Sequence, residues 1–256
     1  MLAVLSPAKS LDETSVVPAV ATTQPRFLED ATRLAHVAAK LRPAALSKLM
    51  HISPALAKLN AERFRSFGGE GRRPALYMFD GDVYHGLQGS TLDEAGVAFA
   101  QDHVRILSGL YGLLRPLDLI EPYRLEMGIP LKAGRKTGLY SWWGNRVAAA
   151  LAEELDGHDD RTLINLASKE YFGVVAVDAL PDSVLAIDFR DEGSDGSLRF
   201  NTFAGKRARG AMARYMVDER LDRPDGLKGF DGMGYRYRAL GSDEGRWLFV
   251  RAAGKV

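Results

Sequence analysis

The chain has 256 residues, of which 46% are hydrophobic and 26% are charged, so it can bury a full core without disulfides or structural metals. It contains no cysteine, which excludes disulfide-linked partners, thiolate metal sites and thiol-based redox chemistry. No apolar run approaches the roughly 18–20 residues of a membrane span, and the amino terminus lacks the basic region of a signal peptide, so we expect a cytoplasmic protein that does not bind membranes.

Strand and helix predictions follow one another irregularly in the first half of the chain. Residues 2–6 predict a strand that ends at Pro7, and apolar residues at helical spacing predict a helix at about 27–41. Thr91 and Glu94 have the form of a capping box that would open a helix running to about His103. A further helix is predicted over residues 140–155.

The second half predicts strands at residues 162–166, 184–191 and 197–203, a helix at 205–220 and a terminal hairpin formed by 235–240 and 246–251. Repeats, linkers and a regular alternation of strand and helix are all absent from the sequence. We therefore expect one mixed α+β domain over residues 1–256 rather than a doubly wound sheet. The segment after Gly241 receives no functional assignment.

Basic residues are concentrated in two segments, although the net charge is only +1. The first basic segment, residues 42–65, contains a single acid, Glu62, and five basic residues, namely Arg42, Lys48, Lys58, Arg63 and Arg65. The second basic segment, residues 204–215, contains no acid and four basic residues, namely Lys206, Arg207, Arg209 and Arg214. Such charge runs occur on solvated helix faces as well as on surfaces that bind nucleic acid.

The first basic segment also predicts a helix-hairpin-helix element at about residues 42–65. Ser53 would cap the second helix and Pro54 would be its first residue. Helix-hairpin-helix motifs direct backbone N–H groups at the start of the second helix toward a phosphate. The glycines usual in the turn are missing, so an ordinary helical hairpin is the alternative. A helical wheel places Leu56, Leu59 and Phe64 on the apolar face of that second helix.

The second basic segment predicts a helix that packs on the core and presents a basic outer face, because its four cations share one arc of the helical wheel. Gly210 lies within that arc, where glycine is unfavourable for a helix by about 1 kcal/mol relative to alanine. Close approach of a ligand and a tight crossing with another helix explain this glycine equally well.

Catalytic and metal-binding motifs are weak. The S-x-x-K pattern at Ser6 and the K-T-G pattern at Lys136 match penicillin-recognising enzymes, but Ser6 ends a strand and no S-D-N motif lies between the two. The five histidines lack ligand spacing, and no P-loop is present. We therefore predict neither a metal nor a cofactor.

Dense polar and aromatic segments are spread over nearly the whole chain, at residues 5–12 (LSPAKSLD), 79–84 (FDGDVY), 107–118 (LSGLYGLLRPLD), 122–128 (PYRLEMG), 164–168 (INLAS), 170–172 (EYF) and 206–210 (KRARG). In type and order they resemble the motifs of the YaaA family of bacterial peroxide-stress proteins. The resemblance implies a cytosolic protein with a mixed fold peculiar to the family. It also implies sequence-independent binding of double-stranded DNA through a basic cleft that includes a helix-hairpin-helix element. Asp80 stands where relatives often have Lys or Asn, so it is not counted as a phosphate contact.

Two hypotheses follow. The first is a DNA-binding protein associated with the response to hydrogen peroxide, with Lys48, His51, Ser53, Lys58, Arg63, Arg65, Lys206, Arg207, Arg209 and Arg214 as the candidate DNA contacts. The second is an enzyme that acts on a nucleotide or nucleic acid through one pocket built from Ser6, Lys9, Asp82, Arg115, Asn165, Ser168 and Lys206. A continuous basic groove would favour the first, and a pocket containing a strongly perturbed titratable group would favour the second. Arg115 and Arg124 alternate with acids, which is also typical of a structural network of ion pairs.

Overall fold

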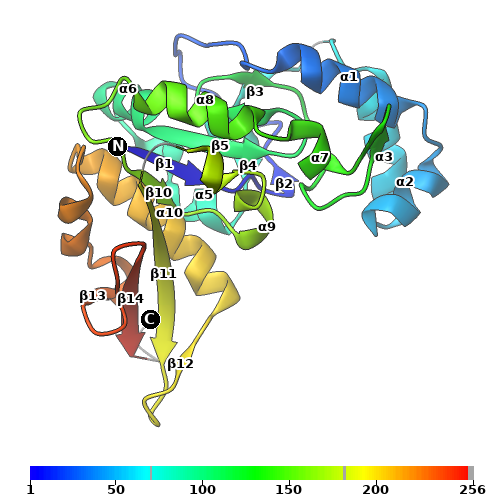
Figure 1. Ribbon diagram of the computed structural model, residues 1–256. Coiled ribbons are helices and arrows are strands. Elements are labelled where there is room, and N and C mark those ends of the chain that lie inside the picture. Colours follow the sequence, from blue (N-terminus) through cyan, green and yellow to red (C-terminus); the bar gives the residue numbers. More distant parts are fainter. Residues whose placement is uncertain (70, 181–182, 253–256) are drawn as a thin grey trace.

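A mixed sheet of eight strands forms the centre of the molecule. The computed structural model describes residues 1–69, 71–180 and 183–252 (Figure 1). The strands of the sheet are β1 (Leu2–Leu5), β5 (Val104–Ser108), β6 (Gly112–Leu114), β10 (Leu163–Asn165), β11 (Val184–Glu192), β12 (Leu198–Arg199), β13 (Arg236–Arg238) and β14 (Arg246–Ala252). Their order is β13-β14-β11-β10-β1-β5-β6, and β12 pairs with the last residues of β11.

The centre of this sheet is parallel. Strands β14, β11, β10, β1 and β5 run in one direction, whereas β6, β12 and β13 pair antiparallel at the margins. The mixed helix and strand content that we predicted is confirmed. The parallel centre, however, is closer to a doubly wound sheet than to the α+β arrangement expected from the sequence. The irregular order of elements conceals it, because a long crossover of several helices separates β1 from its neighbour β5.

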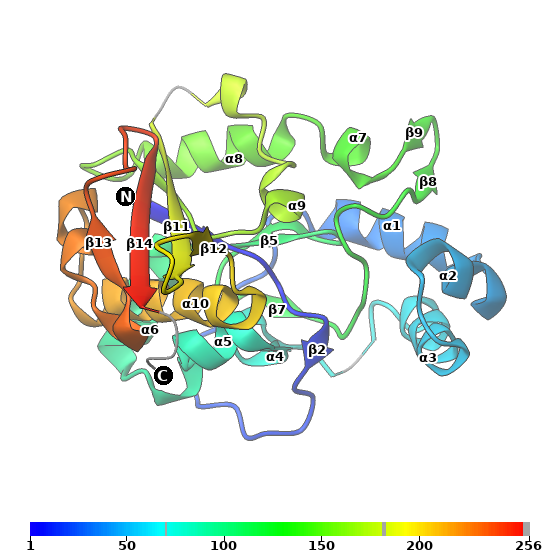
Figure 2. The same cartoon turned by 90° about the horizontal axis from the view of Figure 1, so that it is seen from below.

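Helices cover both faces of the sheet. Figure 2 shows α8 (Arg146–Leu155) on one face and α5 (Asp82–Leu87) with α10 (Thr202–Asp218) on the other. Helix α6 (Glu94–His103) contacts β1 and β5. Shorter helices are α4 (Ala75–Met78), α7 (Leu139–Trp143) and α9 (Lys169–Phe172), and 3-10 turns occur at Gly89–Thr91, Val177–Ala179, Pro224–Gly229 and Gly232–Gly234.

Helices α5 and α10 cross at two facing glycines. A Cβ atom at Gly210 would overlap the carbonyl oxygen of Val83, and one at Gly86 would overlap the carbonyl oxygen of Arg207. Because these neighbours are backbone atoms, only glycine allows so close an approach. Of the two explanations for Gly210, the tight helix crossing is therefore the one that the structure supports.

Three helices form an arm at one end of the molecule (Figures 1 and 2), namely α1 (Leu28–Ala39), α2 (Pro43–Met50) and α3 (Pro54–Arg65). Helix α3 contacts both α1 and α2. The strands β8 (Lys132–Ala133) and β9 (Lys136–Thr137) form a small hairpin that contacts α1. Two further ladders join β2 (Ser10–Leu11) to β4 (Phe79–Asp80) and β3 (Arg73–Pro74) to β7 (Leu119–Ile120).

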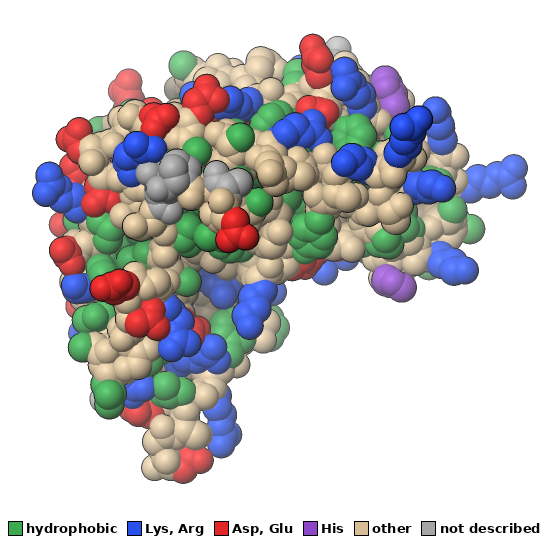
Figure 3. Space-filling view, viewed as in Figure 1, with side chains coloured by type: hydrophobic (Ala, Val, Ile, Leu, Met, Phe, Trp, Pro, Cys, Tyr) green, Lys and Arg blue, Asp and Glu red, His purple; other side chains and the backbone are tan. Residues whose placement is uncertain are grey.

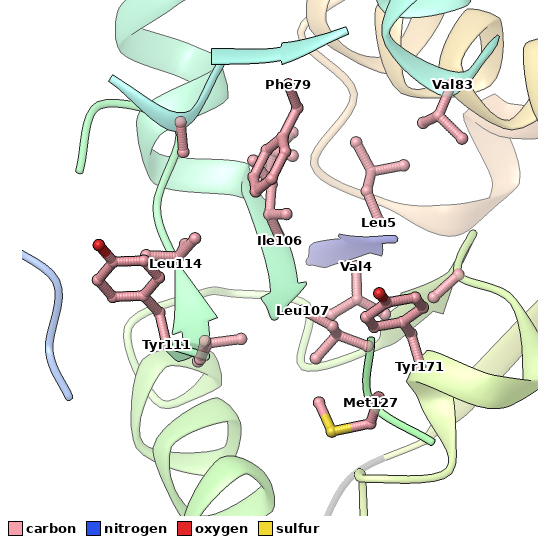
Figure 4. Close-up of a cluster of buried hydrophobic side chains, with 14 of the residues drawn as sticks. Val4, Leu5, Phe79, Val83, Ile106, Leu107, Tyr111, Leu114, Met127 and Tyr171 are labelled. Atoms are coloured by element: carbon pink, nitrogen blue, oxygen red, sulfur yellow. The ribbon is translucent and has the colours of Figure 1, made fainter. Parts of the chain in front are cut away.

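The core is built around β1, which is buried along its whole length. Such a strand is apolar at every position because helices cover both faces of a parallel sheet. Figure 4 shows its side chains within a cluster that includes Val4, Leu5, Phe79, Ile106, Leu107, Met127 and Tyr171. The apolar run ends at Ser6, so the first polar side chain of the segment appears where the strand leaves the core.

Several local predictions can be compared with the structure. The capping box is wrong, because the carboxylate of Asp93, not Thr91, caps α6 by accepting the N–H of Gly96. The helix predicted over 140–155 is interrupted at Gly144, whose φ of 51° ends α7. The strand predicted over 197–203 shrinks to β12, because Asn201 already caps α10. The terminal hairpin is confirmed by the antiparallel pairing of β13 with β14.

Candidate functional site

A cavity lies at the carboxyl ends of β1 and β10. The chain continues from β1 toward β5 and from β10 toward β11, so the connections of these adjacent strands lead to opposite sides of the sheet. Ligands of open parallel sheets bind outside the carboxyl ends of the strands at such a topological switch point. This switch-point cavity has a volume of about 370 Å³. Its walls come from Ser6–Ser10, residues 80–84, Ser168, Glu170, Tyr171, Lys206 and Arg209.

Two serines join the strand ends that form the floor of the cavity. The Oγ of Ser6 accepts a hydrogen bond from the N–H of Ser168 at 2.9 Å and donates one to the Oγ of Ser168 at 3.3 Å. The Oγ of Ser168 also accepts the N–H of Tyr171 and thereby caps α9. Neither hydroxyl has a hydrogen bond to a histidine, lysine or carboxylate among the described residues, as a base would require. These serines therefore fix the two loops relative to each other rather than form a nucleophile–base pair.

Two cations of α10 face the cavity. Lys206 is exposed, and Arg209 is partly buried with its guanidinium 5.6 Å from the centroid of the Phe200 ring. Burial lowers the pKa of Arg209, and the nearby carboxylate of Asp188 partly opposes this effect. Neither cation has a hydrogen bond or ion pair with any residue that the structure describes. Both are therefore available to an anionic ligand.

Carboxylates occupy other parts of the wall. Asp82 is the first residue of α5, is half-buried and has no hydrogen-bonding partner among the described residues. Glu170 accepts the N–H of Gly128 at 3.0 Å, and Asp80 lies 2.7 Å from the Nε2 of His85. Because Asp82 and Glu170 supply acceptors next to the cations of α10, the cavity suits a ligand that carries both an anionic group and hydroxyl or amino donors.

Lys9, at the mouth of the cavity, is joined to the body by an ion pair. Its Nζ lies 3.4 Å from Oε1 of Glu126, and the same carboxylate also accepts a hydrogen bond from Arg124. The side chain of Lys9 is mostly exposed, so this ion pair is weak and leaves the ammonium accessible.

Two tyrosines complete the walls. The hydroxyl of Tyr84 donates to the carbonyl oxygen of Ser6 at 3.2 Å. Burial raises the pKa of Tyr84 and of Tyr171 well above the usual value for tyrosine. Both side chains are therefore neutral near pH 7, and their perturbation reflects burial rather than a role in proton transfer.

The pocket proposed for the enzyme hypothesis is assembled only in part. Of the seven residues of that hypothesis, five line the switch-point cavity, namely Ser6, Lys9, Asp82, Ser168 and Lys206. Arg115 lies instead in a separate hollow, 3.4 Å from Oε1 of Glu154. The Oδ1 of Asn165 accepts the N–H of Ala167 in the turn after β10. We therefore exclude Arg115 and Asn165 from this candidate site.

The lining residues that the sequence analysis did not assign to the pocket include four with large polar side chains, namely Tyr84, Glu170, Tyr171 and Arg209. All four belong to the family-like segments FDGDVY, EYF and KRARG. Membership of those segments was the only signal in the sequence that could have identified them, because their charges and spacings are unremarkable.

The first basic segment is mostly exposed in the arm. Lys48, His51, Ser53, Lys58 and Arg65 are exposed, whereas Arg63 is largely buried in an ion pair with Glu13. No ion pair links Lys48, Lys58 or Arg65 to an acid of the described residues. The charges of these three side chains are therefore uncompensated, whereas Arg63 is paired with an acid.

Helix α3 begins where the sequence predicted, after a short connection from α2. Ser53 caps α3 by accepting the N–H of Leu56, and Pro54 is the first helical residue. His51 takes the left-handed conformation that a glycine would adopt more easily, with a φ of 51°. The predicted apolar face is wrong in part, because Leu56 and Leu59 are exposed and α3 instead buries Ala57, Asn60, Ala61 and Phe64.

The second basic segment does not form one basic outer face. Arg207 is exposed, but Arg209 faces the switch-point cavity. Arg214 donates to Asp218 at 2.8 Å, to the carbonyl oxygen of Gln88 and to the Oγ1 of Thr91. The expected uniform face is therefore divided among a cavity, solvent and a structural contact.

A third group of cations was missed. Lys132, Arg135 and Lys136 lie on the β8–β9 hairpin, which contacts α1, and all three are exposed. None has an ion pair with a described residue. Three basic residues within five positions were a signal in the sequence, but nothing in it indicated that this hairpin lies beside the arm. We call the arm helices together with this hairpin the basic arm.

Neither a metal site nor a membrane-spanning helix is found among the described residues. The part of the chain that the structure describes contains no group of three or more His, Asp or Glu side chains that could hold a metal ion. No helix within residues 1–69, 71–180 and 183–252 is long and apolar enough to cross a membrane.

Comparison with known proteins gives a consistent result. A family model described as "Peroxide stress protein YaaA" matches residues 1–240. A UPF0246 protein of Rhizorhabdus wittichii is 55% identical over 98% of this chain and 99% of its own length. UPF0246 proteins of Phenylobacterium zucineum and Caulobacter vibrioides are 51% and 47% identical over 98% of this chain, and the matches cover 95% and 99% of their lengths. Since the family model and these relatives match nearly the whole chain, the protein belongs to the peroxide stress protein YaaA family.

Proposed function

We propose that this protein binds double-stranded DNA without sequence preference, through the basic arm. The observation that carries the proposal is the cluster of exposed cations without ion pairs to described residues, namely Lys48, Lys58, Arg65, Lys132, Arg135 and Lys136. They come from segments far apart in the sequence and lie at one end of the molecule. In Figure 3, Lys and Arg side chains gather over that end, and Asp and Glu side chains are more frequent over the opposite end.

Phosphate binding explains the chemistry of this surface. Uncompensated Lys and Arg side chains release condensed counterions from DNA when they contact phosphates, and such contacts carry no base information. The start of α3, at Ser53 and Pro54, places the positive end of the helix dipole in the same turn region as Lys58, which would add to the attraction of a phosphate. The absence of thiols from the sequence fits a protective role in peroxide stress that is exercised on DNA rather than on peroxide itself.

The test is a salt titration of a random duplex with the wild type and the Lys58→Glu/Lys136→Glu variant. Each lost phosphate contact should reduce the slope of log K against log[salt] by about 0.9, so the double variant should flatten it by about 2. Arg223→Glu is the matched control, because Arg223 is exposed and has no ion pair with a described residue but lies outside the basic arm. Unchanged affinity in the double variant would refute the proposal.

An enzyme acting on a nucleotide or nucleic acid is the second candidate. The observation that favours it is the switch-point cavity, which most of the residues of that hypothesis line. The hydroxyls of the two serines bond to each other and to backbone N–H groups, and neither bonds to a carboxylate or lysine of the described lining, so ligand binding is the part of this hypothesis that has support.

A further inference from the structure

The switch-point cavity is a site that duplex binding by the basic arm does not use. It lies where β1 and β10 end, and the Ser6–Ser168 hydrogen bonds hold its two loops in place. Its volume of about 370 Å³ falls within the roughly 300–1,000 Å³ of small-molecule sites. In Figure 1 the segments around it, including α9 and the start of α10, border the inner corner between the arm and the lower strands.

The wall formed by α10 carries positive charge and suits an anion. Arg209 is partly buried, yet its guanidinium has no hydrogen bond or ion pair with the described residues. A guanidinium in that position can donate two charge-assisted hydrogen bonds to a phosphate. Water competes less well for these hydrogen bonds in a confined site. Lys206 lies on the same helix, one turn earlier, and brings a second positive charge to the same wall.

The other walls suit a nucleoside. Asp82 and Glu170 offer carboxylate oxygens to hydroxyl or amino groups, as carboxylates at switch points do for ribose. Pro7, Ala8 and Val83 form an apolar surface against which a base can lie. We propose that the switch-point cavity binds a single nucleotide, with the phosphate on Lys206 and Arg209 and the nucleoside against residues 7–8 and 82–83.

Calorimetric titration with dAMP tests this proposal. Wild-type protein should bind dAMP more tightly than 2-deoxyribose 5-phosphate, and 2-deoxyribose 5-phosphate more tightly than inorganic phosphate. Arg209→Gln and Lys206→Gln should each weaken dAMP binding by about tenfold or more. Arg207→Gln is the matched control, because it removes the same charge from the adjacent, exposed position outside the cavity and should bind dAMP normally. Lys206 is exposed, so its variant tests the site even if Arg209→Gln folds poorly.

Absence of dAMP binding, or equal affinity in the Lys206→Gln and Arg207→Gln variants, would overturn the proposal. Equal affinity for dAMP and 2-deoxyribose 5-phosphate would overturn the assignment of the apolar wall to a base. A short single-stranded oligonucleotide distinguishes two sources of the same ligand: competition with dAMP indicates a nucleotide within a strand, and independence indicates a free nucleotide. Since Lys58→Glu/Lys136→Glu lies outside the cavity, it should retain dAMP affinity whether or not it binds duplex.

Discussion

Replacing Gly210 by alanine tests how closely α5 and α10 approach. The added Cβ would lie 2.7 Å from the carbonyl carbon of Val83 and 2.8 Å from the amide nitrogen of Leu87, besides overlapping the Val83 carbonyl oxygen. Carbon atoms in van der Waals contact are separated by about 3.5–4.0 Å. Because the Cβ would lie only 1.7 Å from the carbonyl oxygen of Val83, α5 would have to move by more than about 1 Å.

The expected loss follows from two opposing effects. Alanine is favoured over glycine in a helix by about 1 kcal/mol. Overpacking against backbone atoms costs about 3 kcal/mol, the upper end of the usual range, because no side chain can rotate away. The free energy of unfolding should therefore fall by about 2 kcal/mol. For a chain of this size, such a loss lowers Tm by about 4–8 °C.

Thermal unfolding followed by circular dichroism measures this change, with Gly205→Ala as the control in the same helix. Its Cβ would meet only the ring of Phe200, 2.7 Å away, and that side chain is 42% exposed and can turn aside. Gly205→Ala should melt within a few degrees of the wild type. If Gly210→Ala melts at or above the wild-type temperature, the close crossing is refuted. The Gly210 variant should also bind dAMP less tightly, because Asp82 and Lys206 lie on the displaced helices.

Three other outcomes are expected. Arg105→Met should lower the free energy of unfolding in urea by about 3 kcal/mol, because it leaves the buried carboxylate of Glu154 with only its longer ion pair to the exposed Arg115, whereas adding Glu154→Met should recover part of the loss. Burial, the amino terminus and His103 lower the pKa of His158 to about 4, so native protein loses stability as pH falls from about 6.5 toward 4, and His158→Gln should flatten Tm against pH over that window. Purified protein should not turn over hydrogen peroxide with thioredoxin, since the chain has no cysteine, and thioredoxin-dependent turnover in a coupled assay would contradict this.

Local structure was predicted best where one segment determines the outcome. The all-apolar run at residues 2–5 forms a buried strand, and Ser53 with Pro54 starts a helix, because an apolar run and a helix cap are each recognised from a few consecutive residues. The capping box failed at Thr91 because Asp93 competes for the same N–H groups and lies closer to the first turn. The helical wheel predicted the wrong buried face for α3, because packing against α1 and α2 determines which side chains are buried.

By itself, the sequence determined the family, the mixed composition of helix and strand, the absence of thiol chemistry and the segments in which polar residues concentrate. Only the tertiary structure decided which of those residues meet. Strand order places Ser6 beside Ser168 and separates both from Arg115. The way in which α10 packs places Arg209 at the cavity, whereas Arg214 contacts Asp218. Folding likewise places Lys136 at the same end of the molecule as Lys58. The physical reason is that pairing of distant strands and helices depends on burial summed over the whole chain, which no local pattern of residues encodes.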